Sequence, residues 1–137
     1  MSDLVQSIQD LYAAFGRGDV ATILSQLSPD VSWEVEAPAE ISFAGIRRGP
    51  EAVKGFFQAI ASDHADPKLE ITDYFSSADS VATFGRYQCT LKKTGKRVDS
   101  PVAHLFKFRD GKVIRFVDHI NTAPHRNPQS QNQRNQQ

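Results

Sequence analysis

The chain has 137 residues, 39% of them hydrophobic, and its 16 Lys and Arg balance its 16 Asp and Glu. This is the size of one domain, and the absence of net charge excludes a global field that would attract nucleic acid or an acidic membrane. The single cysteine, Cys89, excludes an intrachain disulfide and a cysteine-based metal cluster. Because no apolar run is long enough to span a membrane and the N-terminus is amphipathic, unlike a signal peptide, we expect a cytoplasmic protein.

The first half of the chain is predicted to contain three helices. Apolar residues recur at helical spacing over 4–15, and Gly16 follows this helix. Asp19 is predicted to cap a short second helix, because an Asp side chain accepts from the free N–H groups of a first turn. Pro50 suits the first position of a third helix, which we expect to reach about His64.

The strands are predicted from alternation and from turn residues. Val31 to Val35 alternates apolar and polar residues, which is typical of a half-buried strand, and Ile41 to Arg47 is expected to be a short extended piece. The second half of the chain is predicted to form four strands, and their short connections favour antiparallel neighbours. These strands are expected at Lys68 to Phe75, Val81 to Leu91, Arg97 to Arg109 and Lys112 to Asn121.

Helices grouped before an antiparallel sheet indicate an α+β domain. A strongly curved sheet around a long helix would leave an open mouth on one side, and such mouths are common ligand sites. We therefore predict one domain over residues 1–122. The Gln- and Asn-rich residues 123–137 have almost nothing to bury and are predicted to be a disordered tail.

The segment from Val102 to Thr122 carries the strongest local signal. Asp110-Gly111 lies between alternating apolar runs and predicts a tight hairpin turn. Polar residues interrupt those runs, and in a half-buried sheet they belong either to a site in a cavity or to satisfied structural groups. They are His104, Asp118, His119 and Asn121.

In this order and spacing, four segments resemble the SnoaL-like branch of the nuclear transport factor 2-like superfamily. They are LYAAFGRGDVATIL from Leu11, VSW from Val31, GIRRGPEAVKGFF from Gly45 and HLFKFRDGKVIRF from His104. The resemblance covers roughly residues 4–122 and implies a cone-shaped, mostly antiparallel sheet packed against three helices, as in ketosteroid isomerase and limonene epoxide hydrolase. It also implies a homodimer formed through the outer sheet face. The fold hosts isomerases, hydrolases, dehydratases, cyclases and non-catalytic binders, so it implies no single activity.

The catalytic residues of ketosteroid isomerase transfer poorly to this chain. The position of its carboxylate base corresponds to about Val35, which cannot abstract a proton. Its oxyanion tyrosine falls near Leu11 or Tyr12, and its protonated aspartate would match His104. Two of the three roles are therefore missing or altered, and steroid isomerisation by that route is not expected.

The residues of limonene epoxide hydrolase are also replaced. The aspartate that activates water near the end of its last strand corresponds to Asn121, which orients water but cannot take its proton. Its Arg and Asp partners would fall near Gly85 and Tyr87. The resemblance thus implies the fold without this mechanism.

Histidine chemistry remains as the catalytic hypothesis. The resemblance places residues 119 and 121 toward the cavity, so His119 is predicted to be an acid or base near neutral pH, with His104 as a hydrogen-bond donor or partner. Hydrogen-bonded structural histidines would explain both positions as well. Asp118, on the opposite face, is predicted to be a surface or interface carboxylate.

Other inward positions are candidates for ligand contact, with simple packing as the alternative for each. These binding candidates are Trp33, Tyr87, Asn121, Tyr12 and Val35. Alternation puts Glu34 and Glu36 toward solvent, although a bulge in that strand would turn Glu36 inward. His and Asp residues show no recognised ligand spacing, so no metal and no cofactor are predicted.

These observations favour a cofactor-independent isomerase, lyase or hydrolase that uses histidine acid/base chemistry on a small, largely apolar molecule carrying a carbonyl or hydroxyl. The alternatives are a binder that holds such a ligand without turnover and a dimeric interaction module. No binding to nucleic acid or to a membrane is expected.

Overall fold

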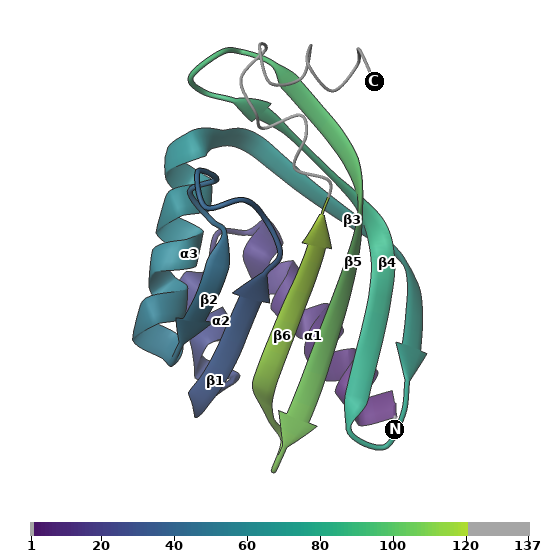
Figure 1. The fold of residues 1–137 in the computed structure, drawn as a ribbon. Helices are drawn as coiled ribbons and strands as arrows, with labels where there is room; N and C mark the ends of the chain where they lie inside the picture. The colour runs from purple at the N-terminus through teal and green to yellow at the C-terminus, as the bar shows by residue number, and fades with distance from the viewer. Residues whose placement is uncertain (1, 121–137) are drawn as a thin grey trace.

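The computed structural model describes residues 2–120, so Asn121 and the predicted tail at 123–137 lie outside the described residues. One six-stranded sheet, in the order β2-β1-β6-β5-β4-β3, forms the frame of the molecule (Figure 1). The elements are α1 (Ser2–Gly16), α2 (Val20–Ser25), β1 (Leu27–Val35), β2 (Gly45–Arg48), α3 (Pro50–Asp63), β3 (His64–Ser76), β4 (Ser80–Leu91), β5 (Arg97–Arg109) and β6 (Lys112–Ile120).

The sheet is mixed, with one parallel pair. Strands β3 to β6 form an antiparallel meander, β1 lies parallel to β6, and β2 is antiparallel to β1. The long strands curve, and α1 crosses behind the sheet while α3 lies beside β1 and β2 (Figure 1). Helix α1 contacts β3 and β4, and α3 contacts β1, β2 and β3. The predicted α+β cone with three helices is confirmed.

Helix α1 forms because its apolar residues fall on one stripe. Ile8, Leu11 and Ala14 are buried against the sheet, and Tyr12 and Phe15 pack at the edge of the same core. The burial of this stripe supplies most of the stability that so short a helix needs.

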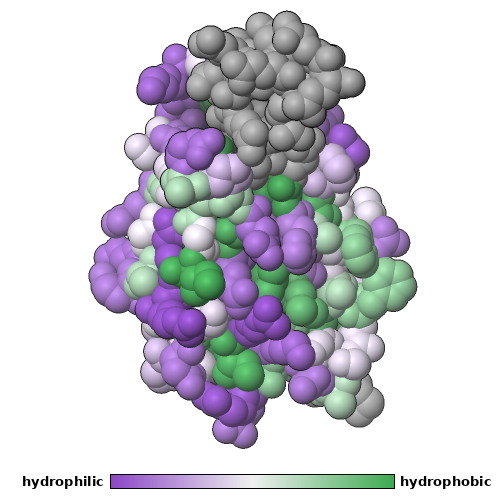
Figure 2. Space-filling model, viewed as in Figure 1, coloured by the Kyte–Doolittle hydropathy of each residue, from purple (hydrophilic) through white to green (hydrophobic). Residues whose placement is uncertain are grey.

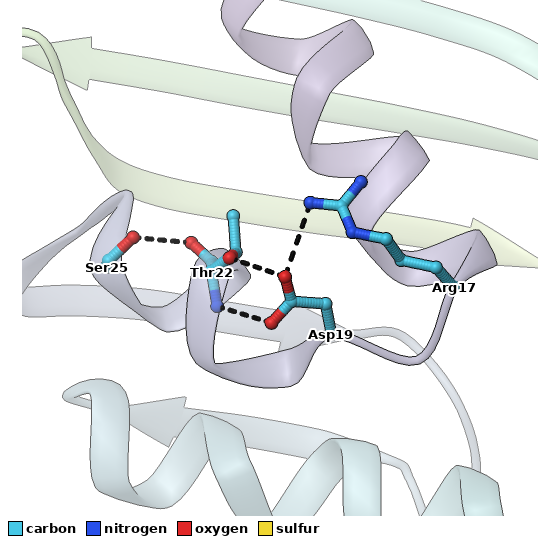
Figure 3. Close-up of polar contacts among 4 residues, drawn as sticks. All are labelled: Arg17, Asp19, Thr22 and Ser25. Carbon is cyan, nitrogen blue, oxygen red and sulfur yellow. Dashed lines mark hydrogen bonds and ion pairs between the residues drawn. The ribbon is translucent and has the colours of Figure 1, made fainter.

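Helix α2 begins at the predicted cap. The Asp19 carboxylate accepts from the Thr22 backbone N–H at 3.2 Å and from the Thr22 hydroxyl at 2.6 Å, and Arg17 lies 3.3 Å away (Figure 3). The Ser25 hydroxyl donates to the Thr22 carbonyl at 2.6 Å, near the end of the helix. A side-chain acceptor at this place satisfies an N–H group that the short helix leaves unpaired.

The hairpin between β5 and β6 has the predicted turn and an irregularity that the sequence does not reveal. Asp110 and Gly111 have φ of 52° and 78°, the left-handed conformation that this kind of turn requires. Phe108 pairs with Val113, but Lys107 pairs with Arg115, so Ile114 is an extra residue in β6. This bulge reverses which side chains of β6 face inward beyond it.

The sheet side of the molecule is a mixed surface, on which hydrophobic residues are separated by hydrophilic ones (Figure 2). Glu34 lies on this outer side and forms an ion pair with Arg115 at 2.8 Å, as its predicted solvent orientation requires. The predicted homodimer through this face stays a prediction. Among the described residues, no helix is both long and apolar enough to cross a membrane.

Candidate functional site

A pocket lies between the concave face of the sheet and the helices α1 and α3. Its volume is about 70 Å³, and most of its wall is aromatic or aliphatic. Five of its residues bring an oxygen atom or an imidazole ring into this apolar wall: Tyr12, His64, Tyr87, His104 and Asp118. The other lining residues are Leu11, Phe15, Trp33, Phe43, Phe56, Phe57, Ile60, Leu69, Val102, Phe106, Phe116 and Ile120.

Tyr12 connects α1 to the sheet through two hydrogen bonds. Its hydroxyl lies 2.7 Å from Thr83 Oγ1 and 2.7 Å from His104 Nδ1. Thr83 and His104 face each other as register partners on β4 and β5, so one phenol reaches both. Burial raises the pKa of Tyr12 far above its usual range, which keeps the phenol protonated and able to donate at neutral pH.

His104 meets Asp118 on its other side. The two residues are direct partners on β5 and β6, and His104 Nε2 lies 3.3 Å from Asp118 Oδ1. Both side chains are nearly buried, with 7% and 10% of their surfaces exposed. The contact has an ion-pair distance, but Asp118 Oδ1 accepts no well-formed hydrogen bond from any described residue.

These contacts assign the protons within the polar cluster formed by Thr83, Tyr12, His104 and Asp118. A carboxylate next to Nε2 favours the His104 tautomer that carries its proton there. Nδ1 then accepts from the Tyr12 hydroxyl, and the Tyr12 oxygen accepts from the Thr83 hydroxyl. The contacts run from Thr83 through Tyr12 and His104 to Asp118, so the imidazole is held between the Tyr12 hydroxyl and the Asp118 carboxylate.

A second polar pair lies elsewhere on the wall. His64 Nδ1 and the Tyr87 hydroxyl are 2.7 Å apart, and both residues are buried. His64 is the first residue of β3 and caps the end of α3, where its backbone N–H donates to the Ile60 carbonyl. Burial raises the pKa of Tyr87, so this phenol also stays neutral.

Trp33 forms an aromatic part of the wall. Its ring stacks on Phe116 with centroids 3.9 Å apart, and Phe56 and Phe57 approach at 5.6 and 5.7 Å. The side chain is 2% exposed, and its Nε1 finds no hydrogen-bond acceptor among residues 2–120.

The structure corrects the predicted orientation of the last strand. His119 is exposed and does not line the pocket, whereas Asp118 is buried and does. The predicted positions of His119 in the cavity and of Asp118 at the surface are therefore wrong. The cause is the extra residue Ile114: Val113 faces inward before it, and Phe116, Asp118 and Ile120 face inward after it.

The other predicted site residues divide into three groups. Trp33, Tyr87, Tyr12 and His104 line the pocket as expected. Val35 is buried in the core and does not line the pocket, and its predicted contact with a ligand stays a prediction. Asn121 lies outside the described residues. No cluster of three or more His, Cys, Asp or Glu side chains is placed to hold a metal within the described range.

Sequence reasoning missed Thr83 and His64 and misplaced Asp118. Thr83 shares its alternation pattern with Val81, which indicated an inward side chain, but nothing local indicated its bond to Tyr12. His64 was assigned to the end of a helix, although β3 begins at that residue directly after α3. Contacts between distant segments, not local pattern, define the polar cluster.

The comparisons with known proteins agree with this fold. The uncharacterized protein Rv0034 of Mycobacterium tuberculosis is 28% identical over 113 residues, which cover 81% of this chain and 83% of that protein. An NTF2-like protein of unknown function from Burkholderia pseudomallei has a TM-score of 0.83 at 26% identity, covering 91% of this chain and 95% of its own. TerC, co-crystallized with polyporic acid, has a TM-score of 0.82 at 26% identity, covering 90% and 95%.

The profile of the SnoaL-like domain matches residues 8–116, which run from within α1 to within β6 and include most of the residues of the pocket wall. With the α+β cone seen in the structure, this match shows that the chain belongs to the SnoaL-like family of the nuclear transport factor 2-like superfamily.

Proposed function

We propose that the pocket binds a small, largely apolar molecule carrying a carbonyl or hydroxyl, and that Asp118 moves a proton on this ligand. The observation that supports this most is a carboxylate, buried beside His104, in the wall of an otherwise apolar pocket. A buried carboxylate without full pairing is costly, and such groups gather where a protein uses them.

The roles within the cluster follow from which atoms are occupied. His104 Nδ1 faces Tyr12 and its Nε2 faces Asp118, so the imidazole acts on the ligand through the carboxylate. His104 is then a positioning residue, and Tyr12 and Thr83 fix its orientation. This changes the hypothesis of histidine as the acid or base into one in which Asp118 contacts the ligand.

The proposed step balances without a further reactant. Asp118 takes a proton from the carbon next to a ligand carbonyl, and the electron pair moves onto the carbonyl oxygen. Return of the proton at another position of the same ligand completes an isomerisation. Where the neighbouring carbon carries a leaving group, the electron pair expels that group, which takes the proton from Asp118, and the reaction is that of a lyase. Positioned acid/base catalysis of this kind contributes about 10²- to 10⁴-fold.

The size of the pocket and one related structure support a small organic ligand. A volume of about 70 Å³ is below the range usual for drug-sized ligands and favours a small molecule. TerC, which shares the fold at 26% identity, was co-crystallized with polyporic acid.

Hydrogen–deuterium exchange tests the proposal with a defined probe. Cyclopentanone is incubated with the protein in D₂O, and deuterium uptake next to its carbonyl is followed by NMR. The wild-type protein should accelerate uptake, and Asp118→Asn should reduce the protein-dependent rate at least about 100-fold. His119→Gln, which changes an exposed residue outside the pocket, is the matched control and should keep the full rate. Full exchange in Asp118→Asn would refute the role of the carboxylate.

Binding without turnover is the second candidate function. It is favoured by Val35, a neutral residue at the position where the resemblance places a catalytic carboxylate. Binding of cyclopentanone in the pocket with no exchange above buffer would support this alternative over the enzyme.

A further inference from the structure

One piece of the pocket wall belongs to neither a helix nor a strand. Of the lining residues within 2–120, Phe43 alone lies in the segment of residues 36–44 that joins β1 to β2. Figure 1 shows this segment beyond the arrowhead of β1, next to α3. Val35 pairs with Gly45, so the two ends of the segment are close together. Compact surface loops with close ends are frequently functional.

The segment closes one end of the pocket. The Phe43 ring lies 6.3 Å from that of Phe56 and 5.5 Å from that of His64. Phe56 also contacts Trp33, with centroids 5.6 Å apart, so Trp33 lies behind this cover. Phe43 and Trp33 are each 2% exposed, and a molecule reaches this closed end only when part of the wall moves. The half-buried lining residues are Tyr12, Phe15, Leu69 and Ile120.

Few backbone hydrogen bonds join the segment to the sheet. Its Ile41 N–H donates to the Pro38 carbonyl and its Ala44 N–H to the Ile41 carbonyl, both at 3.0 Å, and these are turns within the segment. Glu36 N–H donates to the Asp118 carbonyl at 3.4 Å. A segment without ladder bonds opens locally at a lower cost than the strands beside it.

Two side chains fasten the segment in place. Arg47 on β2 donates to the carbonyls of Ser42, Phe43 and Ala44 at 3.2, 3.1 and 3.3 Å. The Ser42 hydroxyl donates to the carboxylate of Asp63, the last residue of α3. Ser42 is exposed and Arg47 is half-buried, so water replaces these bonds when the segment lifts.

Gly45 provides a hinge at the end of the segment. Its φ is 100°, a conformation that a residue with a Cβ rarely adopts, and an added Cβ would meet nothing within 4 Å. Gly45→Ala therefore strains the closed backbone without a steric clash. Gly111 has a φ of 78° and the same open space. Because β1 and β6 are parallel, the turn that contains Gly111 lies at the opposite end of the sheet.

We infer that residues 36–44 form a lid, which turns about Gly45 and opens to give a small molecule access to the closed end of the pocket beside Trp33. The inference goes beyond the proposed function, because it concerns access to the pocket and not the chemistry at Asp118. Opening exposes the apolar side chains of Ile41 and Phe43, so the open state is rare and its detection requires a method that registers minor states.

Hydrogen exchange in D₂O, followed by NMR, measures the opening without a ligand. Trp33 is the sole tryptophan, and its Nε1 has no acceptor among the described residues, so burial protects its proton and exchange reports water at the closed end. The Ala44 amide reports release of the lid itself. In Gly45→Ala both protons should exchange about 5- to 30-fold faster than in the wild type, which corresponds to the cost of a left-handed backbone for alanine.

A matched glycine and a second variant keep the test specific. Gly111→Ala introduces the same kind of strain and should lower stability to urea in the same way, but it should leave the exchange of Trp33 and Ala44 unchanged. Ser42→Ala removes the bond to Asp63 and leaves the backbone intact, so both protons should exchange about 2- to 10-fold faster. Ser25→Ala, which removes another exposed hydroxyl, should have no such effect.

N-bromosuccinimide extends the test from water to an organic molecule. This small reagent destroys indole absorbance irreversibly, and its reaction with Trp33 should become faster by the same factors in Gly45→Ala and Ser42→Ala. Equal acceleration of exchange in Gly45→Ala and Gly111→Ala would indicate global unfolding and overturn the lid. Unchanged exchange in both lid variants, an Ala44 amide that accelerates while Trp33 stays protected, or faster exchange without faster oxidation would each overturn it as well.

Discussion

Removal of the Tyr12 hydroxyl is the sharpest test of the polar cluster. Tyr12→Phe keeps the ring in place but leaves Thr83 Oγ1, in a residue that is 0% exposed, and His104 Nδ1, in a residue that is 8% exposed, without their shared partner. Each buried polar group left unpaired costs about 1–3 kcal/mol. With two such groups, the variant should lose about 2–6 kcal/mol of unfolding free energy.

A double-mutant cycle with Thr83→Val extends this test, because the effect of Thr83→Val on the unfolding free energy should depend on whether the Tyr12 hydroxyl is present. Thr83→Val in the wild-type protein removes one hydrogen bond and should cost about 1 kcal/mol, because Tyr12 keeps its bond to His104. In the Tyr12→Phe background the same change removes a hydroxyl that has already lost its partner, so it should be neutral or stabilising. The coupling between the two sites should be about 1–2 kcal/mol, within the range for residues in contact.

Urea denaturation at pH 7 measures all four proteins. The fluorescence of the single tryptophan, Trp33, reports the loss of the core, and far-ultraviolet circular dichroism gives an independent probe. Additive effects of the two substitutions, or a cost below about 0.5 kcal/mol for Tyr12→Phe, would refute the proposed hydrogen-bond chain.

Two further predictions concern pH and backbone packing. Burial raises the pKa of Tyr12 and Tyr87 above the unfolded value of 10, so their contribution to stability is fully present below pH 10 and is lost as the pH rises above it. Above pH 10, each of the two tyrosines should lower the unfolding free energy by up to about 1.4 kcal/mol per pH unit. Tyr87→Phe should reduce this slope, and equal slopes in the variant and the wild type would contradict the prediction. Gly85→Ala places a Cβ 2.0 Å from the Glu70 carbonyl oxygen and should cost about 1–3 kcal/mol or more in urea denaturation. Gly55→Ala, with nothing within 4 Å in the helix α3, should instead be stabilising by up to about 1 kcal/mol, and a similar loss in both variants would refute the steric argument.

Local chemistry was sufficient to predict most of the elements. The Asp19 cap, Pro50 at the start of α3 and the Asp110-Gly111 turn depend on conformations of a few adjacent residues, and all three are in the structure. The outward orientation of Glu34 follows from simple alternation in β1, and its ion pair with Arg115 agrees with it.

The candidate site was only half predictable. His104, Tyr12, Tyr87 and Trp33 were expected at the cavity and line the pocket. Asp118 was assigned to the wrong face because alternation along an isolated strand offers two orientations, and the choice depends on the register. Ile114 sits in a run, Lys112 to Ile120, that shows no local mark of a bulge.

The sequence by itself thus determined the order of the elements, the family and the apolar character of the core, because these depend on residue type and on periodicity. Only the tertiary structure decided the chemistry of the pocket. Pairing between β5 and β6 selects Asp118 over His119, and packing of α1 brings Tyr12 to partners 71 and 92 positions away. A contact between segments so far apart depends on the whole fold, so no local pattern encodes it.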